Sequence, residues 1–471
     1  MAKKYQTNNY RTEKFGDKYL VTTDHCDFAF LTGEEMRQLA SGSIIDPALK
    51  SRLIHRGILI NDKSIQGIVE KFREKNEFLF QGPSLHIIVT TLRCNHKCVY
   101  CHASSRDMSC KGVDMDKETA RKTVDFIFKS PSSNIAIEFQ GGESLINFET
   151  VKEIVAYANG LNRKHKKNLR FNIVTNLTLM NKEKLDYLIK NEVDICTSLD
   201  GPKELHDKNR RFFSGNGSYE LVSRWITEIN GEYSKRKIKN RRLNALVTIT
   251  KDSLKYPHQI VDEYVSKGFT GVHLRFLNNL GDARGTWKEI SYTPEEFISF
   301  WKRSMDHIIG LNKNGVRIKE RGATIILQKI FDKKDPGFLD LRSPCGAAIG
   351  QLAYDHNGDI YTCDEGRMIG EDIFKLGNVK TDDYSETMAS TNVCAITSSS
   401  INDSVGYCNN CAFKPYCGLC PVCNYAEQGN IIAKVPQTTR CKIFKEQFRY
   451  IFEKLKEPAN SKILRSWTEK F

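Results

Sequence analysis

The chain has 471 residues, of which 40% are hydrophobic and 27% charged, so it can form two or three domains with a large buried core. No stretch approaches the roughly 18 consecutive apolar residues that a membrane-spanning helix needs, and residues 1–14 lack the apolar segment of a signal peptide. We therefore expect a cytoplasmic protein with no membrane partner. In that setting its 15 cysteines favour metal ligation or thiol chemistry over disulfides.

Residues 1–82 differ in pattern from the rest of the chain. Residues 15–32 predict two or three antiparallel strands, and residues 34–42, 47–57 and 65–76 predict short helices. We expect a small N-terminal α+β domain. Two interpretations stay open: a cap on the main sheet, or a winged-helix-like domain that docks a peptide, which rests only on the order of its elements.

Residues 83–320 alternate between strand-like and helix-like segments. The strand-like runs are residues 85–92, 134–140, 169–176, 194–200, 242–250 and 271–278. The helix-like runs between and after them are residues 116–130, 148–161, 182–192, 219–231, 257–269 and 294–311. Six β-α units in series predict an α/β fold with a parallel sheet, a partial (β/α)6 TIM-like barrel.

The unusual motifs of this region each lie at the end of a predicted strand. In chain order they are Cys94, Cys98 and Cys101; Gly141, Gly142 and Glu143; Thr175 and Asn176; and Ser198 and Asp200. Each motif alone is compatible with an ordinary turn, because Gly, Asn and Asp are common turn residues. Since ligands of parallel α/β folds bind at the carboxyl ends of the strands, the four motifs together predict one site on this rim.

The three cysteines on the first loop have the spacing C-x3-C-x2-C. Structural zinc takes four ligands, so a zinc site here would need His96, His102 or a distant residue as well. An iron-sulfur cubane held by three thiolates instead leaves one iron without a protein ligand. That iron can bind a substrate or a cofactor.

With Tyr100 before Cys101 and the Gly141–Glu143 motif after the next strand, the pattern resembles radical S-adenosylmethionine (SAM) enzymes. In that family the open iron binds the amino and carboxylate groups of SAM, and reductive cleavage yields a 5'-deoxyadenosyl radical that abstracts hydrogen from the substrate. The resemblance implies an oxidoreductase with an oxygen-sensitive 4Fe-4S cluster and SAM as cofactors. It also implies an electron donor such as flavodoxin or ferredoxin.

The resemblance also assigns roles around SAM. Gly141 and Gly142 allow close backbone approach, and Glu143 accepts from the methionine ammonium. Polar partners for ribose or methionine are expected at Tyr100, Thr175, Asn176, Ser198 and Asp200. Arg210, or its neighbour Arg211, is expected to pair with the methionine carboxylate. His96 and His102 then lie behind the ligands or face solvent.

A second group of cysteines lies in residues 321–455, before a tail expected at residues 456–471. Its members are Cys345, Cys363, Cys408, Cys411, Cys417, Cys420, Cys423 and Cys441. The region resembles the SPASM extension of peptide and protein maturases, which implies up to two auxiliary 4Fe-4S clusters. The family has a three-residue gap after the cysteine equivalent to Cys417, so the sequence leaves open whether Cys420 or Cys423 is a ligand. Taken alone, the C-x2-C pairs also fit a zinc ribbon.

The other cysteines are scattered. We interpret them as small packing residues or free thiols; they are Cys26, Cys110, Cys196 and Cys394. Asp364 directly follows Cys363, and in the resembling sulfatase maturases an aspartate in that place accepts a proton from the substrate. A solvated turn residue is the alternative for Asp364, and Glu365 is its rival for the role.

Several stretches resemble one subgroup, the radical maturases of His-Xaa-Ser peptide systems. They are residues 137–149, 197–210, 260–269, 374–379 and 415–430. Those enzymes modify a small partner peptide, usually beside a second radical SAM maturase. The resemblance implies a ribosomally made precursor peptide as substrate and a crosslink or oxidised residue as product. Alternatives are a sulfatase-maturase-like enzyme acting on a protein side chain, a radical enzyme acting on tRNA, and a non-enzymatic zinc protein.

The net charge of +14 is concentrated in two runs, residues 162–170 and 233–242. Both fall where helices give way to strands, on the rim opposite the expected site, and we expect them to form a solvated face. Since no RNA-binding module is recognisable, a nucleic-acid partner is not expected.

Overall fold

The computed structural model describes residues 5–238, 240–333 and 335–469. An N-terminal unit begins the chain, with an antiparallel sheet of β2 (Tyr10–Phe15), β3 (Lys18–Thr23) and β4 (Phe28–Thr32). The short strands β1 (Gln6–Thr7) and β5 (Leu59–Ile60) pair antiparallel. Its helices are α1 (Gly33–Ser41), α2 (Pro47–His55) and α3 (Asp62–Asn76). These elements match the expected α+β content.

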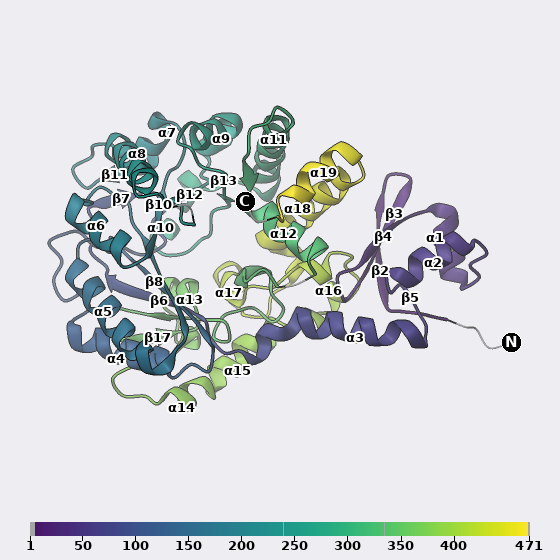
Figure 1. The fold of residues 1–471 in the computed structure, drawn as a ribbon, viewed down its shortest axis with the longest axis horizontal. Helices are drawn as coiled ribbons and strands as arrows, with labels where there is room; N and C mark the ends of the chain where they lie inside the picture. The colour runs from purple at the N-terminus through teal and green to yellow at the C-terminus, as the bar shows by residue number, and fades with distance from the viewer. Residues whose placement is uncertain (1–4, 239, 334, 470–471) are drawn as a thin grey trace.

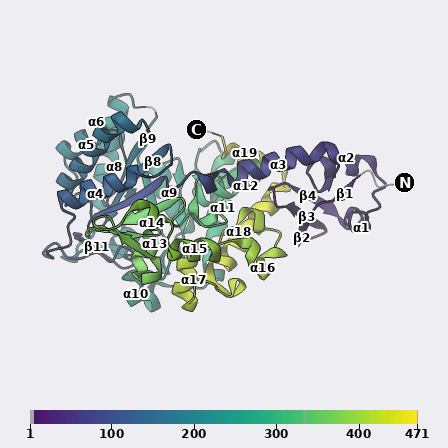
Figure 2. The same cartoon turned by 90° about the horizontal axis from the view of Figure 1, so that it is seen from below.

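The N-terminal unit lies at one end of the long axis, and α3 runs from it toward the main body (Figures 1 and 2). Buried Asp27 joins the two, because its carboxylate lies 2.8 Å from Lys71 Nζ of α3 and 2.6 Å from Lys333 Nζ of the C-terminal region. Burial opposes ionisation of Asp27, but hydrogen bonds from His25, Lys333 and Lys71 hold its pKa well below the ordinary value. The contact is therefore charged and desolvated.

The main sheet carries the predicted barrel strands in parallel. They are β6 (Leu85–Thr91), β8 (Asn134–Gly141), β9 (Asn168–Val174), β10 (Val193–Ser198), β12 (Asn244–Thr248) and β14 (Leu274–Arg275). The helices between and after them are α4 (Lys117–Phe128), α5 (Phe148–His165), α6 (Lys182–Lys190), α7 (Lys203–Asn209), α8 (Tyr219–Lys235), α9 (Pro257–Ser266), α10 (Ala283–Ile290) and α11 (Pro294–Lys313). The partial (β/α)6 barrel is confirmed, with α4, α5, α6 and α8 on the outer face of the sheet (Figure 1), whereas α10 packs against Tyr100 and Leu277.

Side chains alternate between the two faces of each strand, and this alternation determines which residues line the inside of the barrel. In β8, Ile137 and Phe139 are buried toward the helices, whereas Glu138 and Gln140 line the interior. The same alternation continues across β9, β10, β12 and β14. Because successive side chains of a strand point to opposite faces, the polar half of each strand faces the lumen. The lumen is therefore suited to a polar ligand.

The sheet continues beyond the residue 320 boundary predicted between barrel and extension. Strand β16 (Gln351–Tyr354) pairs parallel with β6, and β17 (Asp359–Tyr361) and β18 (Lys375–Asn378) follow antiparallel. The two-residue strands β13 (Gly271–Val272) and β15 (Lys319–Glu320) pair parallel in a small sheet of their own. The C-terminal helices are α12 (Arg321–Phe331), α13 (Asp364–Ile369), α14 (Tyr384–Met388), α15 (Thr391–Ser399), α16 (Gly406–Asn409), α17 (Pro421–Gln428), α18 (Thr439–Leu455) and α19 (Pro458–Ser466).

The expected C-terminal tail is largely a packed helix. α19 contacts α11, α12 and α18, and Leu464 and Trp467 are fully buried there; residues 470–471 lie outside the described part. The apolar spacing of Ile463, Leu464 and Trp467 is the local signal for this helix. In the portion of the chain that the structure describes, no helix has the length and apolar character needed to traverse a bilayer.

Candidate functional site

The first cysteine loop follows β6 and is fixed from several sides. Strand β7 (His96–Cys98) pairs antiparallel with β11 (Arg210–Phe212), which sets Cys98 opposite Arg210. The amide of Cys94 donates to Arg106 O at 2.8 Å, and a hydroxyl from α10 donates to Val99 O at 2.6 Å. Cys94, Cys98 and Cys101 all line one cavity. The structure therefore brings the predicted triplet together.

Gly141 and Gly142 pack directly under this loop. A Cβ at Gly141 would overlap Thr91 O, and one at Gly142 would overlap Arg93 O and lie 2.6 Å from Leu92 O. The amide of Gly142 also donates to Thr91 O at 2.9 Å. Glycine is needed here for contact between two backbone segments as well as for access to the cavity, which both residues line. The motif therefore sets the position of the cysteine loop.

Tyr100, Asp200 and Arg210 form one hydrogen-bonded network. The Tyr100 hydroxyl donates to Asp200 Oδ2 at 2.5 Å and accepts from Arg210 Nη1 at 2.8 Å. Tyr100 and Arg210 line the cavity, while Asp200 is fully buried behind them. The neighbouring Arg211 is exposed. Of the two arginines left open by the sequence, the structure therefore places Arg210 at the cavity.

Glu143 lies behind the cavity wall. Its carboxylate accepts from the Thr175 hydroxyl and the Asn176 amide, both at 2.7 Å, and from the Leu145 amide at 3.0 Å. Burial raises its pKa, although these hydrogen bonds oppose the shift. Thr175, Asn176 and Ser198 line the cavity, whereas Glu143 does not. In this structure Glu143 fixes the loop after β9, and its predicted bond to the SAM ammonium stays a prediction.

The two histidines of the cysteine loop differ in burial. His96 is buried against Phe212, with ring centroids 4.7 Å apart, and burial lowers its pKa to about 3. His102 Nε2 lies 3.0 Å from Asn278 O, and burial lowers its pKa to about 4. Both side chains line the cavity as neutral rings. The solvent-facing alternative is therefore wrong for His96, whereas His102 is partly exposed inside the cavity.

The donor set of the loop fits a cluster held by three thiolates. Burial raises the pKa of the Cys94 and Cys98 thiols, to about 11 for Cys98, so metal binding is needed to hold them as thiolates. Among the described residues, no three His, Cys, Asp or Glu side chains lie together as ligands of one metal ion. A 4Fe-4S cluster makes a different demand, because its thiolates bind separate irons.

The C-terminal cysteines form two groups of four. Cys345, Cys363, Cys420 and Cys423 share one buried cluster with Val422 and Phe374. Cys408, Cys411, Cys417 and Cys441 form the second, in which burial and the neighbouring thiols raise the pKa of Cys408, Cys417 and Cys441. Cys420 and Cys423 both lie in the first group, and which of them is a cluster ligand stays a prediction.

Two cysteines of the first group, Cys363 and Cys420, are held at the N-termini of helices. Cys363 caps α13, where its sulfur accepts from the Gly366 amide at 3.2 Å, and Cys420 caps α17, where its sulfur accepts from the Cys423 amide at 3.5 Å. Arg440 Nη1 also donates to Cys423 Sγ at 3.5 Å. Donors aimed at these sulfurs favour the thiolate form that a cluster requires.

Asp364 is buried and faces Arg367 rather than solvent. Its carboxylate accepts from Arg367 Nε at 2.9 Å, and it is not among the residues that line the cavity. The solvated-turn alternative is therefore wrong. Glu365 is less buried, and burial together with Asp340 and Asp364 raises its pKa to about 7. The choice of proton acceptor between the two stays a prediction.

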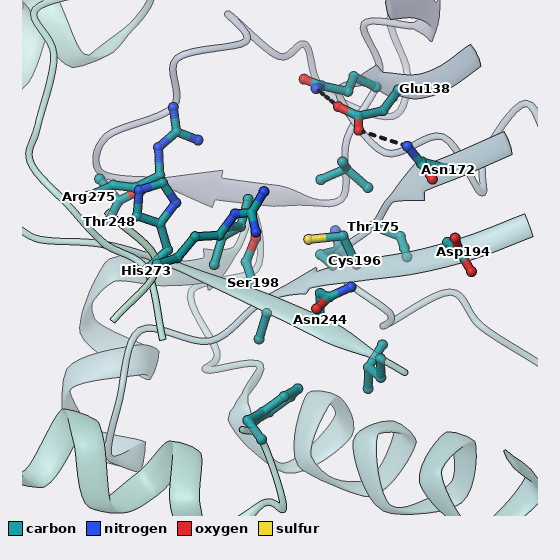
Figure 3. Close-up of a pocket in the computed structure, with 18 of the residues that line it drawn as sticks. Glu138, Asn172, Thr175, Asp194, Cys196, Ser198, Asn244, Thr248, His273 and Arg275 are labelled. Atoms are coloured by element: carbon teal, nitrogen blue, oxygen red, sulfur yellow. Dashed lines mark hydrogen bonds between the residues drawn. The ribbon is translucent and has the colours of Figure 1, made fainter. Parts of the chain in front are cut away.

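The cavity extends from the cysteine loop into the barrel lumen with a volume of about 1280 Å³. Its inner part is lined by residues that the sequence analysis did not select as site residues: Glu138, Asn172, Cys196, His273 and Arg275. Figure 3 shows Glu138 and Asn172 on one side of this pocket and His273 and Arg275 on the other. The alternation of each strand was the signal for these residues. The sequence left open whether Cys196 is a packing residue or a free thiol. In the structure it is a free thiol that lines the lumen.

The second basic run is partly inside this cavity. Arg241 lines it and lies 2.7 Å from Asp194, with 10% of its side chain exposed, and Arg242 lines it too; Lys239 lies outside the described residues. The expected solvated face therefore holds for Lys235, Arg236, Lys237 and Arg242, which are exposed, but not for Arg241. The chain passes from α8 to β12 at this point, so Arg241 and Arg242 lie just before a strand that lines the lumen.

Comparison with known proteins agrees with this site. Residues 88–241 match the model of the Radical SAM superfamily. A cysteine-type anaerobic sulfatase-maturating enzyme of Clostridium perfringens is 26% identical over 396 residues, covering 80% of this chain and 98% of that protein. A serine-type anaerobic sulfatase-maturating enzyme of Bacteroides thetaiotaomicron is 25% identical over 362 residues, covering 70% and 80%.

Two solved structures share the fold. Native anSMEcpe with bound AdoMet has a TM-score of 0.68 at 22% identity, covering 80% of this chain and all of that one. Streptococcus suis SuiB bound to precursor peptide SuiA has a TM-score of 0.55 at 12% identity, covering 91% and 98%. With the domain match and the cysteine loop at the barrel rim, residues 88–241 form the radical SAM domain of an enzyme. Among enzymes with this domain, the curated relatives of the chain support the radical SAM maturases. Its cofactors are those of the class, a 4Fe-4S cluster and SAM.

Proposed function

We propose that this radical SAM maturase modifies a ribosomally made precursor peptide and abstracts hydrogen from a residue held in the barrel lumen. The observation that carries the proposal is the continuous cavity of about 1280 Å³ that joins the cysteine loop to the lumen. Sites for drug-sized ligands occupy about 300–1,000 Å³. The cavity therefore has room for a peptide segment beside SAM.

The residues of the chain orient and enclose the reactants in this proposal. When bound, the cluster supplies an electron and SAM supplies the 5'-deoxyadenosyl radical. Cys94, Cys98 and Cys101 hold the cluster, and Arg210, fixed by Tyr100, pairs with the methionine carboxylate. Thr175, Asn176 and Ser198 offer polar groups to SAM from the adjoining strand ends.

The two C-terminal groups of four thiols are proposed to hold one auxiliary 4Fe-4S cluster each. Four thiolates can ligate every iron of a cubane, so neither cluster needs to bind substrate. The support is that the eight cysteines divide into two sets of four within the folded chain. These clusters are then proposed to pass electrons rather than to bind SAM.

The N-terminal unit is proposed to dock the peptide outside the barrel. Its helix α3 exposes Ile65, Val69 and Phe72, and Phe80 follows with 91% of its surface accessible. An apolar row on a helix next to a three-stranded sheet is the kind of surface that binds an amphipathic or extended segment. A second radical SAM maturase and a flavodoxin or ferredoxin as electron donor complete the proposed partners.

A second candidate is modification of a side chain in a folded protein. The relatives named as sulfatase-maturating enzymes cover most of this chain and favour it. Co-expression under low oxygen with a cysteine-type sulfatase in one culture and a His-Xaa-Ser precursor peptide in another separates the two. A mass change confined to the sulfatase would overturn the peptide proposal.

Anaerobic reconstitution tests the chemistry itself. The reconstituted enzyme with dithionite should form 5'-deoxyadenosine from SAM, and Cys94→Ala, Cys98→Ala and Cys101→Ala should each abolish it. Cys110→Ala is the matched control, since Cys110 does not line the cavity. Retained 5'-deoxyadenosine formation in any of the three variants would refute the assignment of the loop.

A further inference from the structure

The cavity has a strongly basic lining that extends from the cysteine loop to its inner end. It is lined by six arginine and lysine side chains, Arg210, Arg241, Arg242, Arg275, Lys319 and Arg321, and by two carboxylates, Glu138 and Asp194. The two carboxylates do not offset this charge. Asp194 is paired with Arg241 at 2.7 Å, and Glu138 accepts from the amides of Gln140 at 2.5 Å and Asn172 at 3.5 Å, while burial raises its pKa.

Arg275 and Arg321 are the unpaired cations of this lining. In the described residues, neither guanidinium has a hydrogen bond or an ion pair with another side chain or the backbone. Arg275 ends β14 with its side chain half-buried in the lumen, opposite Glu138 in Figure 3, and the two form no ion pair. A charge placed in a partly desolvated cavity without a partner is unfavourable unless a ligand supplies one, and this applies to Arg275. Arg321, the first residue of α12, lines the same cavity but is exposed.

Strand pairing places both arginines near His273. Val272 lies opposite Glu320 in the β13–β15 pair, so Arg321 follows next to His273, and Arg275 comes two residues after His273 at the end of β14. Burial lowers the pKa of His273 well below its ordinary value, and both arginines lower it further; both also favour the thiolate at Cys196. Arg275 exerts the same effect on His102 of the cysteine loop. The unpaired charge therefore lies between the SAM end of the cavity and its inner mouth, where the segment next to a reacting residue would lie.

We propose that Arg275 and Arg321 form a subsite for a carboxylate of the peptide substrate, beside His273. Two planar guanidinium groups can hold a carboxylate by paired hydrogen bonds. The carboxylates of Asp194 and Glu138 do not compete for them, because they are held by Arg241 and by Gln140 and Asn172. The substrate class is thus a peptide with an Asp or Glu side chain, or its own C-terminal carboxylate, next to the modified residue. This inference rests on the proposed function and specifies its substrate.

Isothermal titration of the reconstituted enzyme with SAM present tests the subsite. The probes are Ac-Gly-His-Asp-Ser-Gly-amide, the same peptide with Asn in place of Asp, the Asn peptide with a free C-terminus, and the dinucleotide pUpU. The Asp peptide should bind about 10- to 100-fold more tightly than the Asn amide, the range of a charge-assisted hydrogen-bonded pair. A comparable gain for the free C-terminus would assign the subsite to the terminal carboxylate.

Variants assign the effect to the two arginines. The preference for Asp should disappear in Arg275→Gln and Arg321→Gln, return in part in Arg275→Lys, and persist in Arg236→Gln, whose side chain pairs with Glu232 on the outer surface at 2.9 Å. Equal affinity of wild type for the Asp and Asn peptides, including no detectable binding of either, overturns the proposal, as does tighter binding of pUpU. A loss of SAM affinity in Arg275→Gln with unchanged peptide preference would instead place SAM at this arginine. The peptide titrations test the subsite, whereas 5'-deoxyadenosine formation without peptide tests the radical chemistry. A negative result for the subsite can therefore be told apart from a negative result for the proposed function.

Discussion

Replacing Gly142 with alanine should displace the cysteine loop. The added methyl group would overlap Arg93 O and lie 2.6 Å from both Arg93 C and Leu92 O. These atoms belong to backbone directly before Cys94, so no flexible side chain can move aside. Overpacking of this kind costs about 1–3 kcal/mol. If the overpacking destabilises the loop conformation that binds SAM by this amount, the affinity for SAM decreases by about 5- to 150-fold.

The assay compares Gly142→Ala with Gly160→Ala after anaerobic reconstitution. Gly160 lies on α5 with no atom within 4 Å of an added Cβ, so alanine there should stabilise the protein by about 0.5–1 kcal/mol. Iron content, SAM affinity by equilibrium dialysis and thermal unfolding are measured for both. Gly142→Ala should lower all three and Gly160→Ala none. SAM affinity and iron content of Gly142→Ala equal to wild type would refute the role given to this backbone contact.

Three further substitutions test other parts of the structure. Cys423→Ser should lower the iron content by about four atoms per chain if its group of four thiols holds one cluster. The control Cys394→Ser, at an exposed thiol, should keep the full iron content. Full iron content in Cys423→Ser would leave Cys420 as the ligand. Asp27→Asn should lower the free energy of unfolding by about 2–3 kcal/mol, because a buried carboxylate loses its charged hydrogen bonds. Since the folded-state pKa of Asp27 is lowered, its contribution is fully present above about pH 5 and is lost as the pH falls below about 4, so denaturation of wild type and variant at several pH values should converge in acid. Asp364→Ala should allow 5'-deoxyadenosine formation but lower the yield of modified peptide by mass spectrometry, and unchanged yield, with a loss in Glu365→Gln, would transfer the role of proton acceptor to Glu365.

Local patterns in the sequence predicted most of the fold. The six barrel strands are short runs rich in branched or aromatic residues, and each lies next to a segment with helical periodicity. Cys94, Cys98 and Cys101 lie within eight positions of one another, so a single loop brings them to the same place. Strand β16 was not predicted, because its place beside β6 depends on a pairing across more than 250 residues.

The parts of the site formed by residues close together in the sequence could be predicted. The parts formed by contacts between distant segments could not. The sequence alone determined the barrel class, the cysteine loop and the motifs at the strand ends, since each depends on local spacing. The tertiary structure decided that Arg210 rather than Arg211 faces the cavity, because β11 pairs with β7 in one register. It also placed Cys420 and Cys423 in one group with Cys345 and Cys363, and turned Arg275 into the lumen. These outcomes depend on which face of an element meets which partner, and packing between segments far apart in the chain sets that choice.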